Sequence, residues 1–271
     1  MGDAMTGSGD DAEPVPGVDA GTPSVARMYD YFLGGKDNYA SDRAAAEAVV
    51  KALPTVEGVA RANRAFLQRA VRHVAGLGLD QFLDIGTGLP TQGNVHEIAR
   101  ESQPDARVVY VDNDPMVVVH ARALVATDER TAIIQADVRE PDTILGDPDV
   151  HRLIDVERPV CVLFVAVLHF LPDEDDPAAL VRRFVDPLPA GSHVILSHAA
   201  AEERRNAQVG ETYRSESASA PLVARTRDQV TALLDGLTIV EPGVVPLHEW
   251  RPYGGEYISD AGWTAVARKP G

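Results

Sequence analysis

Gln81–Gly88 reads QFLDIGTG, an apolar run that passes directly into a turn with two glycines, and a helix candidate follows at 93–102. In a sheet covered by helices on both faces, ligands bind at the carboxyl ends of the strands near a topological switch point. A Gly-x-Gly turn at that place lets the backbone approach a ligand without a Cβ in the way. The spacing alone is weak evidence, because an ordinary strand-to-helix turn also has it.

Short apolar runs alternate with amphipathic segments along most of the chain. The runs are Gln81–Ile85, Arg107–Val111, Thr131–Ala136, Val160–Leu168 and His193–Ser197, and the helix candidates are 93–102, 115–126, 143–153 and 177–186. Strands that are apolar on both faces and separated by helices predict a parallel sheet in a Rossmann-like α/β fold. After a further helix candidate at 225–234, the strands Thr238–Val245 and Trp263–Arg268 have no helix between them. They predict an antiparallel hairpin at one sheet edge.

The amino-terminal part of the chain differs from the rest in composition. Residues 1–21 are rich in Gly, Asp, Ser, Thr and Pro, which predicts a disordered tail. Residues 22–78 have apolar residues at helical spacing, interrupted by glycine and proline, and Ser24 is a suitable first cap. We therefore expect a helical extension over 22–78, able to cover a ligand as a lid, before a Rossmann-like domain over 79–271.

The first three predicted strands each carry an acid at the expected ligand edge. Asp84 belongs to the first, Asp112 ends the second and Asp137 follows the third. A carboxylate at the end of the second strand can accept hydrogen bonds from both hydroxyls of a ribose. Thr91 stands where the dinucleotide fingerprint has its third glycine, so the turn is not built for a diphosphate.

These motifs resemble those of class I S-adenosylmethionine-dependent methyltransferases. The resemblance lies in residues 84–88 (DIGTG), 111–114 (VDND) and 135–138 (QADV). Residues 24–39 (SVARMYDYFLGGKDNY) and 62–67 (ANRAFL) are similar to the signature of an actinobacterial S-adenosyl methyltransferase family without a settled substrate. The resemblance implies S-adenosylmethionine as cofactor and S-adenosylhomocysteine as product.

The resemblance also implies how the adenosine part of this cofactor is held. Asp112 would hold the ribose hydroxyls, and Asn113 would lie beside the adenine. Asp137 would accept a hydrogen bond from the exocyclic amine of the adenine, while the backbone N–H of Val138 would contact the ring. The cationic sulfonium suits an acidic pocket.

For the methionine part of the cofactor, the resemblance points to the glycine turn and the amino-terminal helices. Gly86 and Gly88 would lie under the methionine part and the adenosine, and Asp84 would hold the turn or contact the ligand amine. Arg64 has two interpretations: it pairs with the methionine carboxylate, or it belongs to a solvated helix face. Tyr31 belongs to a lid or packs against the sheet.

His169 is the candidate catalytic residue, because it follows the fourth predicted strand and would lie near the transferred methyl group. A neutral imidazole there can act as a general base for a hydroxyl or amine. Alternatively, His169 only shapes the pocket. Cys161 lies inside an apolar strand and is interpreted as an inert buried residue. The sequence contains no cluster with metal-ligand spacing.

Composition excludes several classes of function. The chain has 25 Lys and Arg against 41 Asp and Glu, a formal net charge of −16, which repels nucleic acid. The fourth predicted strand is followed by neither the Asn-Pro-Pro-Tyr nor the Pro-Cys motif of nucleic-acid methyltransferases. One cysteine allows no internal disulfide, and no apolar run reaches the length of a membrane span. Without a signal segment, a cytoplasmic location is expected.

The sequence thus predicts methyl transfer from S-adenosylmethionine to an O or N atom of a small-molecule acceptor. Two alternatives stay open at this point. The first is a non-catalytic S-adenosylmethionine-binding sensor or interaction protein, because every predicted site residue serves binding as well as chemistry. The second is an NAD-dependent dehydrogenase, which Thr91 disfavours.

Overall fold

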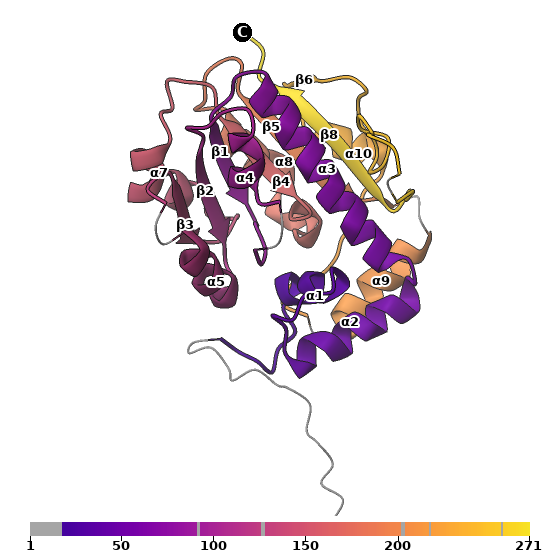
Figure 1. Cartoon of the computed structure of the whole chain (residues 1–271). Coiled ribbons are helices and arrows are strands. Elements are labelled where there is room, and N and C mark those ends of the chain that lie inside the picture. Colours follow the sequence, from indigo (N-terminus) through magenta and orange to yellow (C-terminus); the bar gives the residue numbers. More distant parts are fainter. Residues whose placement is uncertain (1–17, 91–92, 126–127, 202–203, 217, 256) are drawn as a thin grey trace, which may run out of the picture.

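The computed structural model describes residues 18–90, 93–125, 128–201, 204–216, 218–255 and 257–271. In this part of the chain, an eight-stranded sheet has the order β3-β2-β1-β4-β5-β8-β6, with β7 also paired to β8 (Figure 1). The predicted Rossmann-like α/β fold is confirmed. Of the predicted tail over 1–21, residues 1–17 lie outside the described residues.

Five parallel strands form the centre of the sheet: β1 Gln81–Ile85, β2 Arg107–Asp112, β3 Thr131–Gln135, β4 Cys161–Val165 and β5 His193–Ala199. Every residue of β1 and β4 is buried, as expected for strands covered on both faces. The chain continues from β1 to β2 on one side and returns to β4 on the other, so the switch point lies between β1 and β4. A ligand is expected at their carboxyl ends.

The antiparallel edge of the sheet is built around β8 Gly262–Arg268, which pairs with β5. Two short strands, β6 Thr238–Ile239 and β7 Val245–Pro246, pair antiparallel with β8. The antiparallel pairing confirms the predicted edge, but the predicted strand Thr238–Val245 is interrupted. A turn that includes Gly243, at φ +95°, separates β6 from β7 and explains the interruption, because extended strand backbone has negative φ.

Helices cover both faces of the sheet. On one face lie α3 Val56–Gly76, α4 Val95–Arg100 and α5 Pro115–Val125. On the other lie α6 Pro141–Leu145, α7 Pro148–Leu153, α8 Pro177–Val185 and α10 Arg227–Ala232. The predicted helix 143–153 is therefore two helices. Pro148 is the first residue of α7, where its missing N–H is harmless, whereas inside a longer helix it would break the hydrogen-bond ladder.

A third group of helices lies beyond the carboxyl ends of the parallel strands. It consists of α1 Val25–Phe32, α2 Ala40–Ala52 and α9 Arg204–Ser215, which we call the helical cap (Figure 1). Met28 and Phe32 of α1, Val49 of α2 and Val209 and Tyr213 of α9 share one buried apolar cluster. The start of α3 contributes to this cluster, and the rest of α3 packs on the sheet. Among the described helices, none is long and apolar enough to cross a membrane.

Candidate functional site

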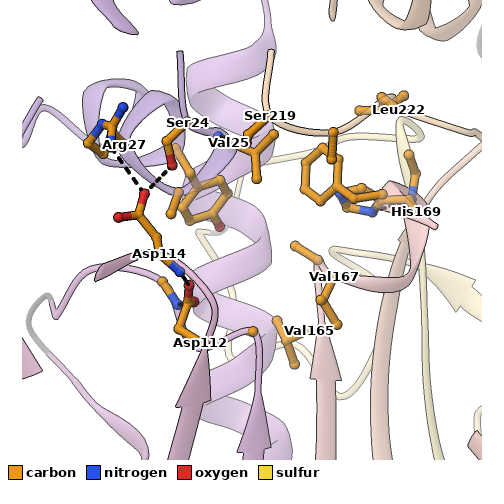
Figure 2. A pocket seen from close by; sticks show the side chains of 18 of the residues that line it. Ser24, Val25, Arg27, Asp112, Asp114, Val165, Val167, His169, Ser219 and Leu222 are labelled. Carbon is orange, nitrogen blue, oxygen red and sulfur yellow. Dashed lines mark hydrogen bonds and ion pairs between the residues drawn. The ribbon is translucent and has the colours of Figure 1, made fainter. Parts of the chain in front are cut away.

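A cavity of about 540 Å³ lies between the carboxyl ends of the parallel strands and the helical cap. Its volume falls within the range of small-molecule sites, about 300–1,000 Å³. Figure 2 shows Asp112 and Asp114 on one side of the cavity and His169 with Leu222 on the other, with Val165 and Val167 between them. The switch point of the sheet therefore opens into the cavity, as the topology predicts.

The two glycines of the turn after β1 both line this cavity. Gly86 has φ +71° and Gly88 has φ +68°, in the region that favours glycine. A Cβ on Gly86 would lie 2.5 Å from the Cγ2 atom of Val167, so the turn packs against the segment after β4. A Cβ on Gly88 would meet no atom within 4 Å. Gly88 therefore keeps open the space next to its backbone.

Asp84 lies beneath this turn and does not line the cavity. Its carboxylate accepts a hydrogen bond from the Thr87 hydroxyl at 3.1 Å, which ties the turn to β1. Burial raises the pKa of Asp84 to about 6, although Thr87 and the nearby Arg64 guanidinium partly offset the effect. Arg64 donates to the carbonyl oxygen of Gly93 at 3.1 Å and is also outside the cavity lining.

Asp112 ends β2 and lines the cavity with 6% of its surface exposed. One carboxylate oxygen accepts the backbone N–H of Gly88, and the other accepts that of Asp114, each at 2.9 Å. These bonds fix the carboxylate at the end of the strand and join the turn after β1 to the turn after β2. Burial raises the pKa of Asp112 to about 6.

Asn113, Asp137 and Val138 line the cavity beside Asp112. The Asp137 carboxylate pairs with the Arg139 guanidinium at 2.6 Å, and this bond lowers its pKa more than any other interaction does. The nearby Asn113 side chain also lowers the pKa of Asp137. The ends of β2 and β3 thus present adjacent acceptors and amides, as the sequence led us to expect. We call this part, with the glycine turn, the acidic end of the cavity.

Asp114 contributes an interaction that the sequence does not reveal. Its carboxylate accepts the backbone N–H of Met116 at 2.8 Å, near the start of α5. The other carboxylate oxygen accepts the Ser24 hydroxyl at 2.5 Å and lies 3.3 Å from the Arg27 guanidinium (Figure 2). Arg27 also pairs with Asp42 at 2.8 Å, and both side chains are buried. The buried network therefore links the helical cap to the turn after β2.

Residues 18–27, which we call the strap, close the cavity over its acidic end. The guanidinium of Arg27 donates to the carbonyl oxygens of Asp19 and Thr22, at 3.0 and 2.8 Å. Residues 18–21, predicted as part of the tail, are therefore held against the helical cap. Within the cap, Tyr29 lines the cavity, whereas Tyr31 does not. The Tyr29 hydroxyl donates to the carbonyl oxygen of Ala60 at 3.1 Å.

His169 lies in the short helix η1 Leu168–Phe170 and lines the opposite side of the cavity. Its Nδ1 atom accepts the backbone N–H of Ala199 at 3.3 Å, so in the neutral ring the proton is on Nε2. Burial, and then the neighbouring His198 and Arg225, lower the pKa of His169 well below its usual value. At neutral pH the free ring nitrogen is therefore a hydrogen-bond donor, whereas a general base needs a free acceptor.

His198 and Arg225 fix the position of η1, and with it that of His169. The Nε2 atom of His198 accepts from Arg225 at 2.9 Å, while its Nδ1 atom donates to the carbonyl oxygen of Ala199 at 2.9 Å. The buried Arg225 guanidinium also donates to the carbonyl oxygens of Leu168 and Leu171, at 3.1 and 3.0 Å. Arg225 is thus a positioning residue for η1. Its partners lie more than 25 residues away in the sequence, so no local pattern reveals it.

Beyond His169 the cavity wall is mostly apolar and comes from the helical cap, the start of α3 and the segment after β4. We call this the apolar end of the cavity; its lining includes Phe32, Val49, Leu53, Val56, Phe170 and Tyr213. The charged residues of the described lining are Asp19, Arg27, Asp112, Asp114, Asp137 and Arg139, which belong to the strap and to the ends of β2 and β3. The cavity is therefore divided by chemistry into an acidic and an apolar end.

Comparison with known proteins identifies the family. A family model described as S-adenosyl methyltransferase matches residues 11–270. The chain belongs to this family. The methyltransferase is 41% identical to a DUF574-family protein from Streptomyces avermitilis, with a TM-score of 0.88 over 92% of this chain and 98% of that one. It is 40% identical to a proposed methyltransferase from Thermobifida fusca, with a TM-score of 0.90 over 94% and 98% of the two chains.

More distant similarity concerns the fold alone. Human N-acetylserotonin methyltransferase, solved in complex with SAM, is 16% identical and has a TM-score of 0.50, covering 93% of this chain and 64% of that one. No curated protein matches the methyltransferase. Family membership makes the chain an S-adenosylmethionine-dependent methyltransferase and confirms the predicted cofactor. The NAD-dependent dehydrogenase alternative is thereby set aside. In the described part of the chain, no group of acidic, histidine or cysteine side chains is arranged to hold a metal ion.

The residues at the acidic end fit S-adenosylmethionine chemically. A cofactor with a ribose diol, an amino-purine and a cationic sulfur requires carboxylates and close backbone approach. The cavity offers Asp112 for the diol and Asp137 with Val138 for the purine. Gly88, whose Cβ would project into open space, allows the backbone approach.

Proposed function

We propose that the methyltransferase binds S-adenosylmethionine at the acidic end of the cavity and methylates an O or N atom of a small molecule held at the apolar end. The supporting observation is that one cavity joins both ends and has walls of opposite character. A methyl donor and an acceptor must meet in one water-poor space, because alignment and exclusion of water supply much of the acceleration.

For the adenosine, we propose Asp112 as the acceptor for both ribose hydroxyls, with Asn113 beside the adenine. Asp137 would accept a hydrogen bond from the exocyclic amine, and the backbone N–H of Val138 would bond to the ring. Since Asp137 already pairs with Arg139, the amine would share this carboxylate with the guanidinium.

For the methionine part, we propose that the ligand lies over Gly86 and Gly88. Asp84 would act by holding the turn through Thr87, because it lies outside the cavity lining. Arg64 would contribute at longer range, through its charge. Tyr29 lines the cavity, whereas Tyr31 does not. Tyr29 of the helical cap would therefore contact the ligand in place of Tyr31.

When bound, S-adenosylmethionine supplies an electrophilic methyl group on a cationic sulfur. The carboxylates of the acidic end favour this positive charge. His169 would orient the acceptor by donating a hydrogen bond from Nε2, while Arg225 keeps the ring in position. The strap would act as a lid, since Arg27 and Ser24 fasten it to Asp114 at the end of β2.

A small molecule is favoured over a macromolecule as acceptor for two reasons. The strap and the helical cap line the cavity, whose volume of about 540 Å³ is that of a small-molecule site. The formal net charge of −16 disfavours the phosphate backbone of nucleic acid.

The cofactor site is tested by comparing two glycines of similar backbone strain. Gly88 and Gly78 have φ of +68° and +97°, and a Cβ on either would meet no atom within 4 Å, but Gly78 is outside the cavity lining. Alanine at either site is expected to cost about 1–2 kcal/mol of stability. Only Gly88→Ala should also weaken S-adenosylhomocysteine binding, by tenfold or more, because its methyl group enters the ligand space.

The measurement is titration calorimetry with S-adenosylmethionine, S-adenosylhomocysteine and NAD, supported by thermal unfolding. For the unmodified chain, S-adenosylhomocysteine at about 100 times its Kd should stabilise the fold by about 2.7 kcal/mol. Equal affinity of the two glycine variants would place the ligand elsewhere.

A further inference from the structure

Three aromatic rings follow one another along the wall of the apolar end. The ring centroids of His169 and Phe170 lie 4.4 Å apart, and those of Phe170 and Tyr213 lie 5.8 Å apart. The first two rings belong to η1, and Tyr213 comes from α9, more than 40 residues later in the chain. Planar rings that line a small cavity at these spacings offer edge and face contacts to another flat ring.

Two hydrogen-bond donors in this wall have no protein partner among the described residues. Nδ1 of His169 is occupied by the Ala199 N–H, which leaves Nε2–H as the donor at the cavity. Tyr213 is 5% exposed, and burial is the sole cause of its raised pKa, so the hydroxyl keeps its proton. Both side chains line the cavity, so the two donors are available to whatever fills it. A ligand that carries an acceptor oxygen would take up these donors, each neutral hydrogen bond contributing about 0.5–1.5 kcal/mol.

The same wall limits the charge of the occupant. The charged side chains of the described lining belong to the strap and to the ends of β2 and β3, away from the apolar end. A carboxylate, phosphate or ammonium group at the apolar end would lose its hydration without gaining an opposite charge. An uncharged molecule avoids this desolvation cost.

We infer that the methyl acceptor is an uncharged, planar aromatic molecule with a carbonyl or similar acceptor oxygen. His169 Nε2–H and the Tyr213 hydroxyl are the donors available to that oxygen, and the three rings offer edge and face contacts to the aromatic ring. This inference rests on the proposed function, because it concerns the acceptor half of the same cavity. It makes Tyr213 a specificity-determining residue.

The test uses four single-ring probes with the methyltransferase saturated by S-adenosylhomocysteine. Acetophenone carries the acceptor oxygen, ethylbenzene lacks it, benzoate adds a negative charge and benzylamine a positive one. Dissociation constants are measured by ligand-observed NMR. Acetophenone should bind about threefold to tenfold more tightly than ethylbenzene, the effect of one or two neutral hydrogen bonds. Benzoate and benzylamine should bind more weakly than ethylbenzene.

Tyr213→Phe keeps the ring and removes the hydroxyl, so the advantage of acetophenone over ethylbenzene should fall about twofold to threefold. His169→Phe should act in the same direction. Tyr253→Phe is the matched control, because Tyr253 is 72% exposed and lies outside the cavity lining. In all three variants S-adenosylhomocysteine affinity should match that of the unmodified chain.

Benzoate or benzylamine binding as tightly as acetophenone would overturn the inference. The same conclusion follows if Tyr213→Phe leaves the preference for acetophenone unchanged, or if no probe binds while S-adenosylhomocysteine does. In those cases the proposed function stands, since the cofactor still binds. Failure of S-adenosylhomocysteine itself to bind would overturn the proposed function and the inference together.

Discussion

At the scale of single residues, two carboxyls of similar burial have different surroundings. Asp84 and Asp112 are 4% and 6% exposed, and burial raises the pKa of each to about 6. Asp112 lines the cavity, whereas Asp84 lies beneath the glycine turn. Substituting each carboxyl in turn therefore distinguishes the loss of a buried charge, common to both variants, from the loss of a ligand contact, expected only at Asp112.

The first prediction compares Asp112→Asn with Asp84→Asn. Hydrogen bonds to a charged acceptor contribute about 1.5–3 kcal/mol each, so Asp112→Asn should weaken S-adenosylhomocysteine binding at least tenfold. Asp84→Asn, which removes an equally buried charge, should change the affinity less than threefold. Titration calorimetry at pH 7.5 measures both. An equal loss in the two variants would mean that Asp112 acts through the turn, without contacting the ribose.

The second prediction concerns pH. Since both carboxyls have a pKa near 6, against 3.8 in an exposed side chain, the folded chain takes up protons before the unfolded chain does. Their contribution to the free energy of unfolding therefore increases as pH falls from about 6 to about 4. Ligand affinity should change in the opposite direction, because only ionised Asp112 accepts from both ribose hydroxyls. We expect Kd to rise up to tenfold per pH unit below 6.

Calorimetric titrations between pH 5 and 8 measure this dependence. Asp112→Asn serves as the control, because its side chain stays neutral throughout and its weaker affinity should vary little with pH. An unmodified chain whose affinity is the same at pH 5 and pH 7.5 would contradict the assignment of the ribose contact.

At the scale of elements, the sequence predicts those helices and strands whose formation depends on residues close together in the chain. The apolar runs predict β1 to β5 within a few residues, because burial on both faces requires them. The helix α9 escapes prediction, because Arg204–Ser215 has few apolar residues and contains Gly210. It packs against α2, about 160 residues away in the sequence. A contact over this distance leaves no pattern in the local sequence.

The same reasoning applies to the site. The ends of β1, β2 and β3 bring Gly88, Asp112 and Asp137 into one cavity because parallel strands share a direction. Ser24 and Arg27 could not be placed there from the sequence, because their bonds to Asp114 span 90 and 87 residues. Strand-end residues are thus accessible to sequence analysis, and contacts made by the strap are not.

The third prediction concerns the strap and compares two serines. The Ser24 hydroxyl donates to Asp114 at 2.5 Å, whereas the Ser219 hydroxyl accepts the backbone N–H of Val25 at 3.2 Å and does not reach β2. If the strap holds the ligand in, Ser24→Ala should speed S-adenosylhomocysteine dissociation by about threefold or more, since a bond to a charged acceptor is lost. Ser219→Ala removes a longer bond that involves no charged group, so it should speed dissociation less than Ser24→Ala does.

Stopped-flow displacement measures the dissociation rate, and hydrogen exchange follows the amides of α1. Faster exchange in α1 of the Ser24→Ala chain, with no change in dissociation, would show that the strap is a packing element and not a lid.

At the scale of the whole molecule, the net charge of −16 acts on anything that approaches the cavity. S-adenosylmethionine carries one positive charge more than S-adenosylhomocysteine, at its sulfur. The field of the protein therefore favours the substrate form of the cofactor over the product form. Salt weakens this preference, because the screening length is on the order of 10 Å at 0.1 M ionic strength.

The fourth prediction follows from this difference. Between about 0.02 and 0.3 M sodium chloride, the Kd of S-adenosylmethionine should rise severalfold relative to that of S-adenosylhomocysteine. The two ligands share every other group, so each is the control for the other. A Kd ratio that does not change with salt would show that the preference comes from short-range contacts alone.

The two ends of the cavity have separate origins in the chain. The sheet and its turns supply the acidic end, whereas much of the apolar end comes from α1, α2 and α9, which contribute no strand to the sheet. Of these helices, α1 and α2 also carry Arg27 and Asp42 of the buried network at the acidic end, whereas α9 carries none of it. Mutations in α9 can therefore accumulate with little effect on the cofactor. Related enzymes can therefore evolve different acceptor selectivity through substitutions in α9 alone. Exchanging this helix between relatives is a route to engineered selectivity.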